Sequence, residues 1–130
     1  PAAGALREIR EELGLSLGPD AVLGLLDDYV TRSGYVITPF VVWGGADPTL
    51  APDPGEVRSV HRISLRELCR ADSPRFITIP ESDRPVVQVA IGRDVIFAPT
   101  GAVLLQFRRV CLEGVLERVH DYEQPVFAWK

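Results

Sequence analysis

The first segment of the chain carries an apolar stripe at helical spacing. Leu6, Ile9 and Leu13 recur every three or four positions with charged residues between them, which is the pattern of an amphipathic helix. The chain opens with a proline, which suits a first helical turn, and Gly14 suits the position just past the last turn. The pattern predicts a helix over residues 1–13 with its apolar stripe turned inward.

The next segments show strand and turn signals. Residues 21–31 are rich in Val, Leu and Tyr, and residues 35–43 (YVITPFVVW) are strongly β-prone. Because Arg-Ser-Gly at 32–34 suits a tight turn, the two runs predict a β-hairpin. Pro39 has no N–H to donate, which favours a sheet edge or a bulge at that point. Residues 44–55 are rich in Pro and Gly and predict a loop.

The second half of the chain mixes strand and helix patterns. Ser64, followed three residues later by Glu67, forms a capping box at the start of a short helix. A long helix from Thr100 is expected to bury Val103, Leu104, Phe107, Val110, Cys111 and Leu112. In order, we predict a strand over 56–63, a helix over 65–70, an irregular segment over 71–84, a hairpin of 86–91 and 95–98, a helix over 100–119 and an extended tail over 122–130.

Charge and cysteine content narrow the class of protein. The chain has 130 residues, enough for one domain with its own core. Its net charge of −4 disfavours nonspecific binding to a nucleic-acid backbone, which needs a basic surface. Cys69 and Cys111 show no CxxC spacing and are expected to be reduced, mostly buried thiols of a cytoplasmic protein. No apolar run reaches the roughly 18 residues of a membrane span, and no signal peptide is visible.

An acidic cluster lies on the first predicted helix. Glu11 and Glu12 follow Glu8 by three and four positions, so the three side chains share one helix face. Like charges at this spacing repel one another unless a cation offsets them. Mg²⁺ prefers oxygen ligands and is typically held by carboxylates together with substrate phosphates. The cluster therefore points to metal-assisted phosphate chemistry, and Arg7 can reach Glu11 one turn further along the helix.

Residues 7–15 (REIREELGL) resemble the second half of the Nudix box. The family pattern is G-x5-E-x7-R-E-U-x-E-E-x-G-U, where U is a bulky aliphatic residue, and every fixed position from its arginine onward is matched here. The first half of the box would lie before Pro1, as would the first strand that Nudix domains usually carry. Because the chain also contains no methionine, we expect the N-terminal part of the domain to lie upstream of this sequence.

The resemblance implies a fold, a metal and a role for each charged residue of the box. Nudix domains are α/β/α sandwiches with a mixed β-sheet between helices, so we expect a single Nudix domain over residues 1–130. Glu8, Glu11 and Glu12 would ligate Mg²⁺, with Mn²⁺ as a substitute, and Arg7 would orient the acidic cluster. The reaction would be hydrolysis of the diphosphate linkage of a nucleoside diphosphate derivative, because a bound metal ion offsets phosphate charge and lowers the pKa of its water.

The rest of the chain is similar to the coenzyme A pyrophosphatase-like subgroup of Nudix proteins. Residues 29–42 (YVTRSGYVITPFVV) contain the T-x-S-G-x-x-(I/V)-x-P pattern of that subgroup, and residues 52–57 (PDPGEV) also fit it. Residues 96–102 (IFAPTGA) resemble its entry into the last helix, with Phe97 where a tryptophan is usual. Coenzyme A or an acyl derivative is therefore the first candidate substrate.

Many Nudix enzymes take a further acid, as metal ligand or general base, from a segment after the box. Glu56 is the first candidate because an acid that opens this predicted strand recurs in the family, although an exposed strand-edge carboxylate explains it equally well. Glu81 and Asp83 lie in the predicted irregular segment and are weaker candidates.

Other functions stay open. ADP-ribose or a nucleoside diphosphate sugar could be the substrate, because the box defines the bond cleaved and not the group recognised. A Nudix-fold binding module without catalysis is a second class, favoured by the missing front half of the box and opposed by the presence of Arg7 and all three glutamates. The expected partner is the small-molecule substrate, and neither nucleic acid nor a membrane is expected. The apolar C-terminal helix and the β-rich middle of the chain are also compatible with a homodimer.

Overall fold

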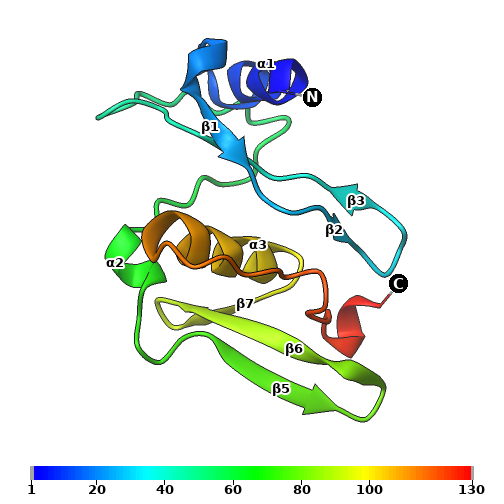
Figure 1. Cartoon of the computed structure of the whole chain (residues 1–130). Coiled ribbons are helices and arrows are strands. Elements are labelled where there is room, and N and C mark those ends of the chain that lie inside the picture. The colour runs from blue at the N-terminus through cyan, green and yellow to red at the C-terminus, as the bar shows by residue number, and fades with distance from the viewer. Residues whose placement is uncertain (1, 130) are drawn as a thin grey trace. The chain divides into compact units, whose positions relative to one another are not determined.

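The computed structural model describes residues 2–129 and contains both helices and antiparallel β-sheets (Figure 1). This mixture confirms the expected α/β class. The chain divides into two compact units. The first comprises Pro1–Leu25 and Phe40–Arg62, and the second comprises Leu26–Pro39 and Ile63–Lys130. The expectation of a single domain stays a prediction, and each unit is described by itself.

The first unit consists of a helix, a short 3-10 turn and a two-stranded sheet. Helix α1 (Ala2–Leu13) confirms the predicted amphipathic helix, whose first predicted residue, Pro1, lies outside the described residues. A 3-10 turn over Pro19–Ala21 leads into β1 (Val22–Leu25), which pairs antiparallel with β4 (Phe40–Val42). The long loop predicted after the hairpin follows β4, so both the helix and the loop were readable from composition.

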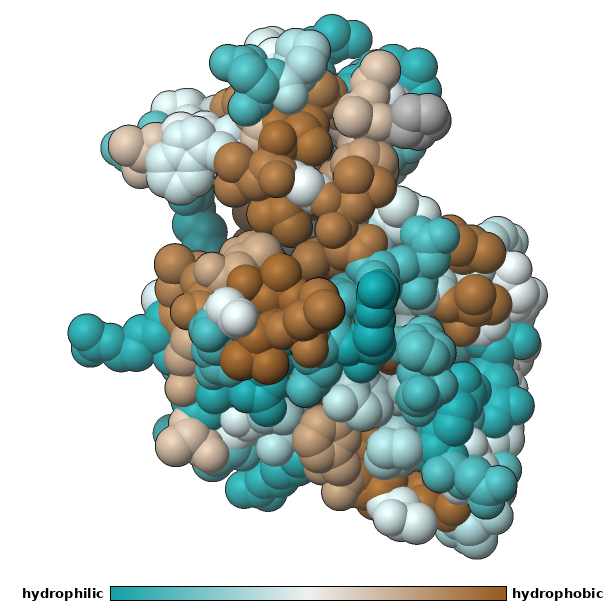
Figure 2. Space-filling view, in the orientation of Figure 1, coloured by the Kyte–Doolittle hydropathy of each residue, from teal (hydrophilic) through white to brown (hydrophobic). Residues whose placement is uncertain are grey.

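None of the described residues of the first unit is buried. The apolar stripe of α1, which consists of Leu6, Ile9 and Leu13, is half-buried rather than enclosed. On β1, Leu23 and Leu25 keep 66% and 61% of their surface exposed, and they share one face because strand side chains alternate. Figure 2 shows such apolar side chains gathered on the open surface of this unit. The unit therefore has an apolar face but no core of its own.

The second unit begins with the turn of the predicted hairpin. Strands β2 (Tyr29–Val30) and β3 (Val36–Ile37) pair antiparallel, and the N–H of Gly34 donates to the carbonyl of Thr31 at 3.0 Å to close the turn. Pro39 follows β3 and lies outside every ladder. The sequence predicts an edge or a bulge at this proline, and the structure has a break between β3 and β4 instead, since a residue without an N–H cannot continue the pairing.

A three-stranded antiparallel sheet and one helix form the core of the second unit. The sheet order is β5 (Arg75–Ile79), β6 (Ser82–Ile91) and β7 (Asp94–Phe97), and α3 (Thr100–Phe107) lies across it (Figure 1). The β6–β7 hairpin matches the predicted one, because Ile91 pairs with Asp94 around a two-residue turn. The buried cluster between these elements consists of Tyr29, Val87, Val89, Ala98, Ala102, Leu105 and Val119.

Gly101 lets α3 approach the sheet closely, and its replacement by alanine is expected to destabilise the protein. A Cβ at Gly101 would lie 2.5 Å from the carbonyl oxygen of Ile96, closer than any real contact. Overpacking of this kind costs about 1–3 kcal/mol, which outweighs the roughly 1 kcal/mol that alanine contributes to a helix. Chemical denaturation should therefore show a lower free energy of unfolding for Gly101→Ala. The control is Gly4→Ala in α1, where a Cβ meets nothing within 4 Å. A loss of stability in the control equal to that in Gly101→Ala would contradict this explanation.

Two predicted segments in the middle of the chain are wrong. The segment over 71–84 was expected to be irregular but contains β5 and the start of β6. Its prolines flank the strand instead of interrupting it: Pro74 precedes β5, and Pro80 occupies the turn across which Ile79 pairs with Ser82. Conversely, no strand forms over 56–63, because the chain there is occupied by a turn and then runs without ladder partners within the described residues.

The predicted long helix over 100–119 is also wrong in length and in its buried face. After α3 the chain continues as a π-helical turn, Arg108–Leu112, and stops. Gly114 then adopts a φ of 67°, a left-handed conformation that ends helices and that glycine reaches without strain. Val110 and Cys111, expected to be buried, are exposed. The buried positions of α3 are Gly101, Ala102, Leu105 and Gln106.

The tail was predicted to be an extended arm, and this is wrong as well. Glu123, Gln124 and Pro125 are buried, Glu123 forms a parallel bridge with Val86 of β6, and Val126–Ala128 make a short 3-10 helix. The charged glutamate gave no apolar signal from which burial could be predicted. Its contacts are with residues far away in the sequence, and they are described below.

Helix α2 (Leu65–Leu68) begins as predicted. The Oγ of Ser64 accepts a hydrogen bond from the N–H of Glu67 at 3.1 Å, which confirms the N-cap. The carboxylate of Glu67 does not complete the capping box. It accepts instead from the N–H of Gly92 at 2.7 Å and from Arg70 at 2.8 Å, so that it holds the β6–β7 turn. The helix ends at Leu68, two residues before the predicted end at Arg70.

Both cysteines are free, as expected, but neither is buried. Cys69 and Cys111 are exposed, since one follows the end of α2 and the other lies on the open side of the π-helical turn. None of the helices formed by residues 2–129 has the length and apolarity that crossing a bilayer requires.

Candidate functional site

Helix α1 presents the charged residues of the box on an open surface. Glu8 is exposed, the side chain of Glu11 is 60% exposed, and Glu12 is half-buried. The Nε of Arg7 lies 3.9 Å from Oε1 of Glu11, which is the predicted contact one turn along the helix. Because both side chains are mostly in solvent, this pair contributes little to stability. The acids are therefore free to turn toward a ligand.

The C-terminal end of α1 is closed by a glycine and by a distant loop. Gly14 adopts a φ of 68°, and its N–H donates to the carbonyl of Arg10 at 3.0 Å. The N–H of Ala51 donates to the carbonyl of Leu13 at 2.8 Å. A Cβ at position 14 would lie only 2.9 Å from the Cβ of Ala51. Position 14 thus requires glycine for two reasons: the backbone is left-handed, and the loop approaches too closely for a Cβ.

The same loop carries Glu56 toward the end of α1. The N–H of Asp53 donates to the carbonyl of Glu12 at 2.8 Å, which ties the loop to the helix at a box residue. Asp53 then organises a turn: its Oδ1 accepts from Gly55 at 2.9 Å, and its carbonyl accepts from Val57 at 2.8 Å. Glu56 therefore lies in a turn that is anchored on Glu12, and it is exposed there. The strand that was expected to carry it is absent, but the acid stays connected to the helix.

The other acids proposed from the sequence do not join this group. Glu81 occupies the β5–β6 turn and Asp83 the start of β6, both exposed and both in the second unit. Across residues 2–129, no three side chains of His, Cys, Asp or Glu gather closely enough to hold a metal ion by themselves. The carboxylates of Glu8, Glu11 and Glu12 thus share a helix without forming a closed cage.

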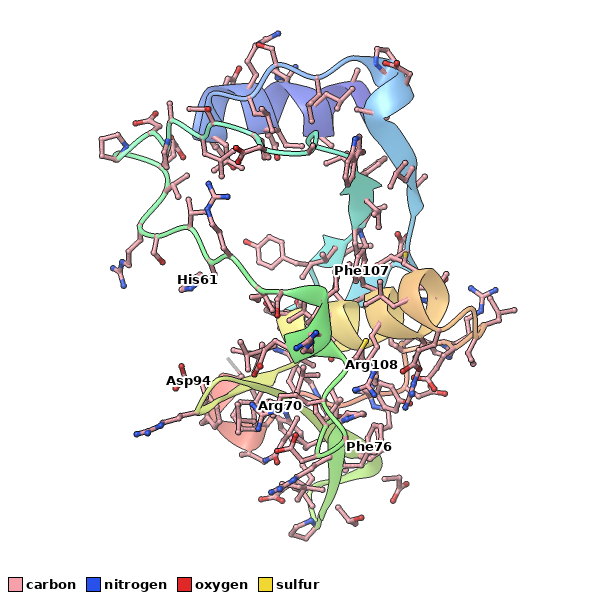
Figure 3. All side chains as sticks on the ribbon, turned by 90° about the vertical axis from the view of Figure 1, so that its left-hand side faces the viewer. His61, Arg70, Phe76, Asp94, Phe107 and Arg108 are labelled. Carbon is pink, nitrogen blue, oxygen red and sulfur yellow. The ribbon has the colours of Figure 1, made fainter. Side chains whose placement is uncertain are left out.

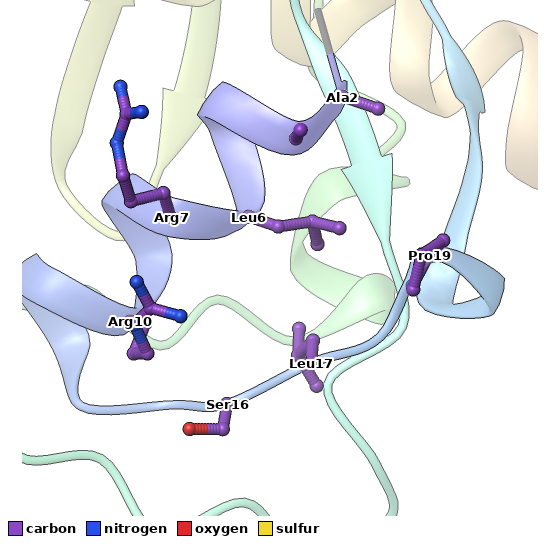
Figure 4. A pocket seen from close by; sticks show the side chains of 8 residues that line it. Ala2, Leu6, Arg7, Arg10, Ser16, Leu17 and Pro19 are labelled. Atoms are coloured by element: carbon purple, nitrogen blue, oxygen red, sulfur yellow. The ribbon is translucent and has the colours of Figure 1, made fainter.

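A cavity of about 440 Å³ lies beside α1 (Figure 4). It is framed by α1, by the segment that follows Gly14 and by the 3-10 turn. Glu8, Glu11 and Glu12 are not among its lining residues, so it opens on another side of the helix. The lining residues are Ala2, Ala3, Leu6, Arg7, Arg10, Ser16, Leu17 and Pro19. No motif in the sequence indicated this cavity, although the spacing of Arg10 three positions after Arg7 could have indicated a basic edge.

The second unit contains a buried carboxylate that the sequence did not reveal. The side chain of Glu123 is fully buried and accepts hydrogen bonds from Arg32 at 2.7 and 3.0 Å, from Arg84 at 2.8 Å and from Ser82 at 2.8 Å. The guanidinium of Arg32 also stacks 3.7 Å from the ring centre of Trp129. Burial opposes ionisation of Glu123, but the hydrogen bonds from Arg32, Ser82 and Arg84 outweigh it and lower its pKa to about 2. The network ties the turn after β2 and the start of β6 to the C-terminal segment.

Other charged residues of the second unit are also committed to structure. Arg70 and Arg108 lie on neighbouring elements (Figure 3), where Arg108 donates to the carbonyl oxygens of Arg70 at 3.1 Å and Ser73 at 2.7 Å. Arg70 itself pairs with Asp72 and with Glu67. In the first unit, His61 lies exposed on the loop before α2 (Figure 3) and contacts Ser59 at 2.9 Å. None of these groups offers a second reactive centre.

Comparisons with family models, curated proteins and solved structures give no match to this chain. The charged motif on α1 and the geometry around it therefore carry the functional inference.

Proposed function

We propose that α1 is the metal-binding helix of a Mg²⁺-dependent Nudix hydrolase, which cleaves the diphosphate linkage of a nucleoside diphosphate derivative. In this proposal the chain forms part of an α/β/α sandwich with a mixed sheet. One observation carries it: the box-like residues coincide with a helix whose end needs the glycine of the pattern. Gly14 has a left-handed backbone and no room for a Cβ beside Ala51. The charged and the structural positions of the motif are thus consistent with each other.

The acids of α1 fit Mg²⁺ by their chemistry. Carboxylate oxygens are the hard ligands that this ion prefers, and it usually takes only one or two of them and completes its octahedron with waters and substrate phosphates. A closed cage of three acids is therefore not needed, and three carboxylates on an open helix face are compatible with binding that the diphosphate completes. When bound, the ion would supply charge neutralisation and a more acidic water.

The proposal assigns a role to each charged residue of the candidate site. Glu11 and Glu12, with Glu8, would hold the ion against the diphosphate. Arg7 would keep Glu11 in place through their contact at 3.9 Å. Glu56 is the proposed further acid, because its turn is tied to the carbonyl of Glu12 through Asp53. Hydrolysis adds water across the P–O–P bridge and leaves two monophosphate esters.

Coenzyme A or an acyl derivative is the first candidate substrate, on the similarity of residues 29–42 and 52–57 to that subgroup. ADP-ribose and nucleoside diphosphate sugars carry the same reactive linkage and remain enzymatic alternatives. A second class, a binding module without catalysis, is favoured by one observation. Within residues 2–129 the acids of α1 are not drawn together into a metal cage.

Hydrolysis should depend on a divalent cation. Incubation of the protein with coenzyme A, ADP-ribose and a nucleoside diphosphate sugar is expected to release two monophosphates from at least one of them with Mg²⁺. Chelation by EDTA should stop the reaction, and added Mg²⁺ or Mn²⁺ should restore it. Chromatography of the products measures the turnover. Binding of these compounds without any hydrolysis would favour the binding module, and neither binding nor hydrolysis would overturn both proposals.

A further inference from the structure

We propose that the cavity beside α1 is a binding site for a phosphate ester that has an apolar body, separate from the acidic face of the same helix. A cavity of about 440 Å³ is of the size that small ligands occupy in proteins. Its lining residues include two arginines and a serine together with several apolar residues. This composition suits a ligand with one strongly charged end.

The charge of the cavity comes from one edge of the helix. Arg7 and Arg10 are three positions apart, so they project on the same side of α1. Arg7 has Glu11 as a distant partner at 3.9 Å, whereas no ion pair to Arg10 forms within residues 2–129. In Figure 4 the guanidinium of Arg7 points away from that of Arg10, so Arg10 is the group that would attract an anion. Arginine is the side chain best shaped to hold a phosphate, because its N–H groups can donate two parallel hydrogen bonds.

The apolar part of the cavity faces this charged edge. In Figure 4, Leu6, Leu17 and Pro19 point toward one another across the cavity, while Arg10 and Ser16 lie together at one end. A phosphate placed between Arg10 and Ser16 would leave the ester carbon directed toward the leucines and the proline. Inorganic phosphate would fill only the charged end. The cavity therefore favours an organic phosphate over the free ion.

The acids of the box are not part of this site. Viewed down the helix axis, Arg10 is separated from Glu8 and Glu12 by more than a quarter turn, since successive residues advance by about 100°. The phosphate would therefore not be the diphosphate held by the acidic face. It could be a further phosphate of the same substrate, or the phosphate of a separate effector. Both sources share the chemistry that Arg10 would recognise.

The binding experiment uses phenyl phosphate as the probe, in EDTA, so that no divalent cation can recruit phosphate to the acids. Amide chemical shifts of Ser16 and Leu17 should change saturably on titration, and benzyl alcohol, which lacks the charge, should give no such change. Arg10→Gln is expected to weaken binding about tenfold, the effect of losing a charge-assisted hydrogen bond. Arg66→Gln removes the same charge from an exposed position of α2 and should leave the affinity unchanged. Equal affinity in the wild type and Arg10→Gln, or shifts without saturation, would overturn the proposal.

A kinetic experiment distinguishes the two sources and rests on the proposed function. Coenzyme A and dephospho-coenzyme A share the diphosphate and differ by one phosphate monoester. If the site holds that group, Arg10→Gln should raise KM about tenfold for coenzyme A and leave KM for dephospho-coenzyme A unchanged. An unchanged KM for both, with phenyl phosphate binding lost, would assign the site to a separate phosphate ester, whereas an equally raised KM for both would contradict the separation from the diphosphate. Absence of all hydrolysis would contradict the proposed function alone, because the phenyl phosphate titration does not depend on catalysis.

Discussion

Glu12→Gln is expected to lower Mg²⁺-dependent diphosphate hydrolysis by about 10²–10³-fold, the usual effect of removing one strong electrostatic contact from a catalytic site. The amide has the shape of the carboxylate but no charge, so it is a poor ligand for a hard cation. Glutamine and glutamate have similar helix propensities, and Glu12 makes no ion pair within residues 2–129. Helix α1 should therefore persist, and circular dichroism should show an unchanged spectrum while turnover is lost.

The same change at Glu11 should act in the same direction. It also removes the partner of Arg7, a contact at 3.9 Å between two exposed side chains, which contributes too little to affect folding. Asp47→Asn is the matched control, because this exposed carboxylate lies in the loop after β4. Its turnover should equal that of the wild type. Undiminished turnover in both Glu11→Gln and Glu12→Gln would refute the assignment of α1 as the metal-binding helix.

Glu123→Ala should clearly destabilise the second unit. The change leaves Arg32 and Arg84 without the buried carboxylate that both contact at 2.7–2.8 Å. Because both guanidinium groups stay partly exposed to water, the loss is that of charge-assisted hydrogen bonds, about 1.5–3 kcal/mol, which is still a large share of the roughly 5–15 kcal/mol that stabilises a typical domain. Urea denaturation should show this loss. Asp121→Asn, two residues away with its side chain 75% exposed, should cost about 1 kcal/mol or less.

The same residue gives the protein a defined acid sensitivity. The pKa of Glu123 falls from an ordinary value of 4.5 to about 2 in the folded protein. A carboxyl whose pKa is depressed by folding stabilises the folded state fully above its unfolded pKa. This contribution is then lost as the pH falls from about 4.5 toward 2. Glu123→Gln should remove this part of the pH dependence, so its free energy of unfolding should vary less than that of the wild type over this window. An identical slope in both proteins would show that Glu123 does not titrate as described.

Elements defined by local signals could be predicted from the sequence. Helix α1 and the glycine that ends it follow from the spacing of Leu6, Ile9 and Leu13, and the tight turn before β3 follows from its glycine. The N-cap at Ser64 is another local feature, since donor and acceptor are three residues apart. In each case the interactions that decide the structure lie within a few positions of one another.

Elements decided by distant contacts could not be predicted. Strand β5 has prolines on both sides, and only its pairing with β6 shows that they flank it. Glu123 is buried because Arg32, 91 positions earlier, reaches it. The same limit applies to the candidate site. The positions of Glu8, Glu11 and Glu12 on one helix face were readable, whereas the tie from Asp53 to Glu12 joins segments far apart in the sequence.

The absence of buried residues in the described part of the first unit bears on how its chemistry would be controlled. A segment without an enclosed core opens easily, so its folded population is sensitive to small free energies. Any ligand that binds only the folded form stabilises that form, by about 2.7 kcal/mol at a hundredfold excess over its Kd. In the first unit, binding of the metal ion, the diphosphate or the phosphate ester would thus stabilise the folded state. Occupancy of the site and order of the helix that builds it would rise and fall together.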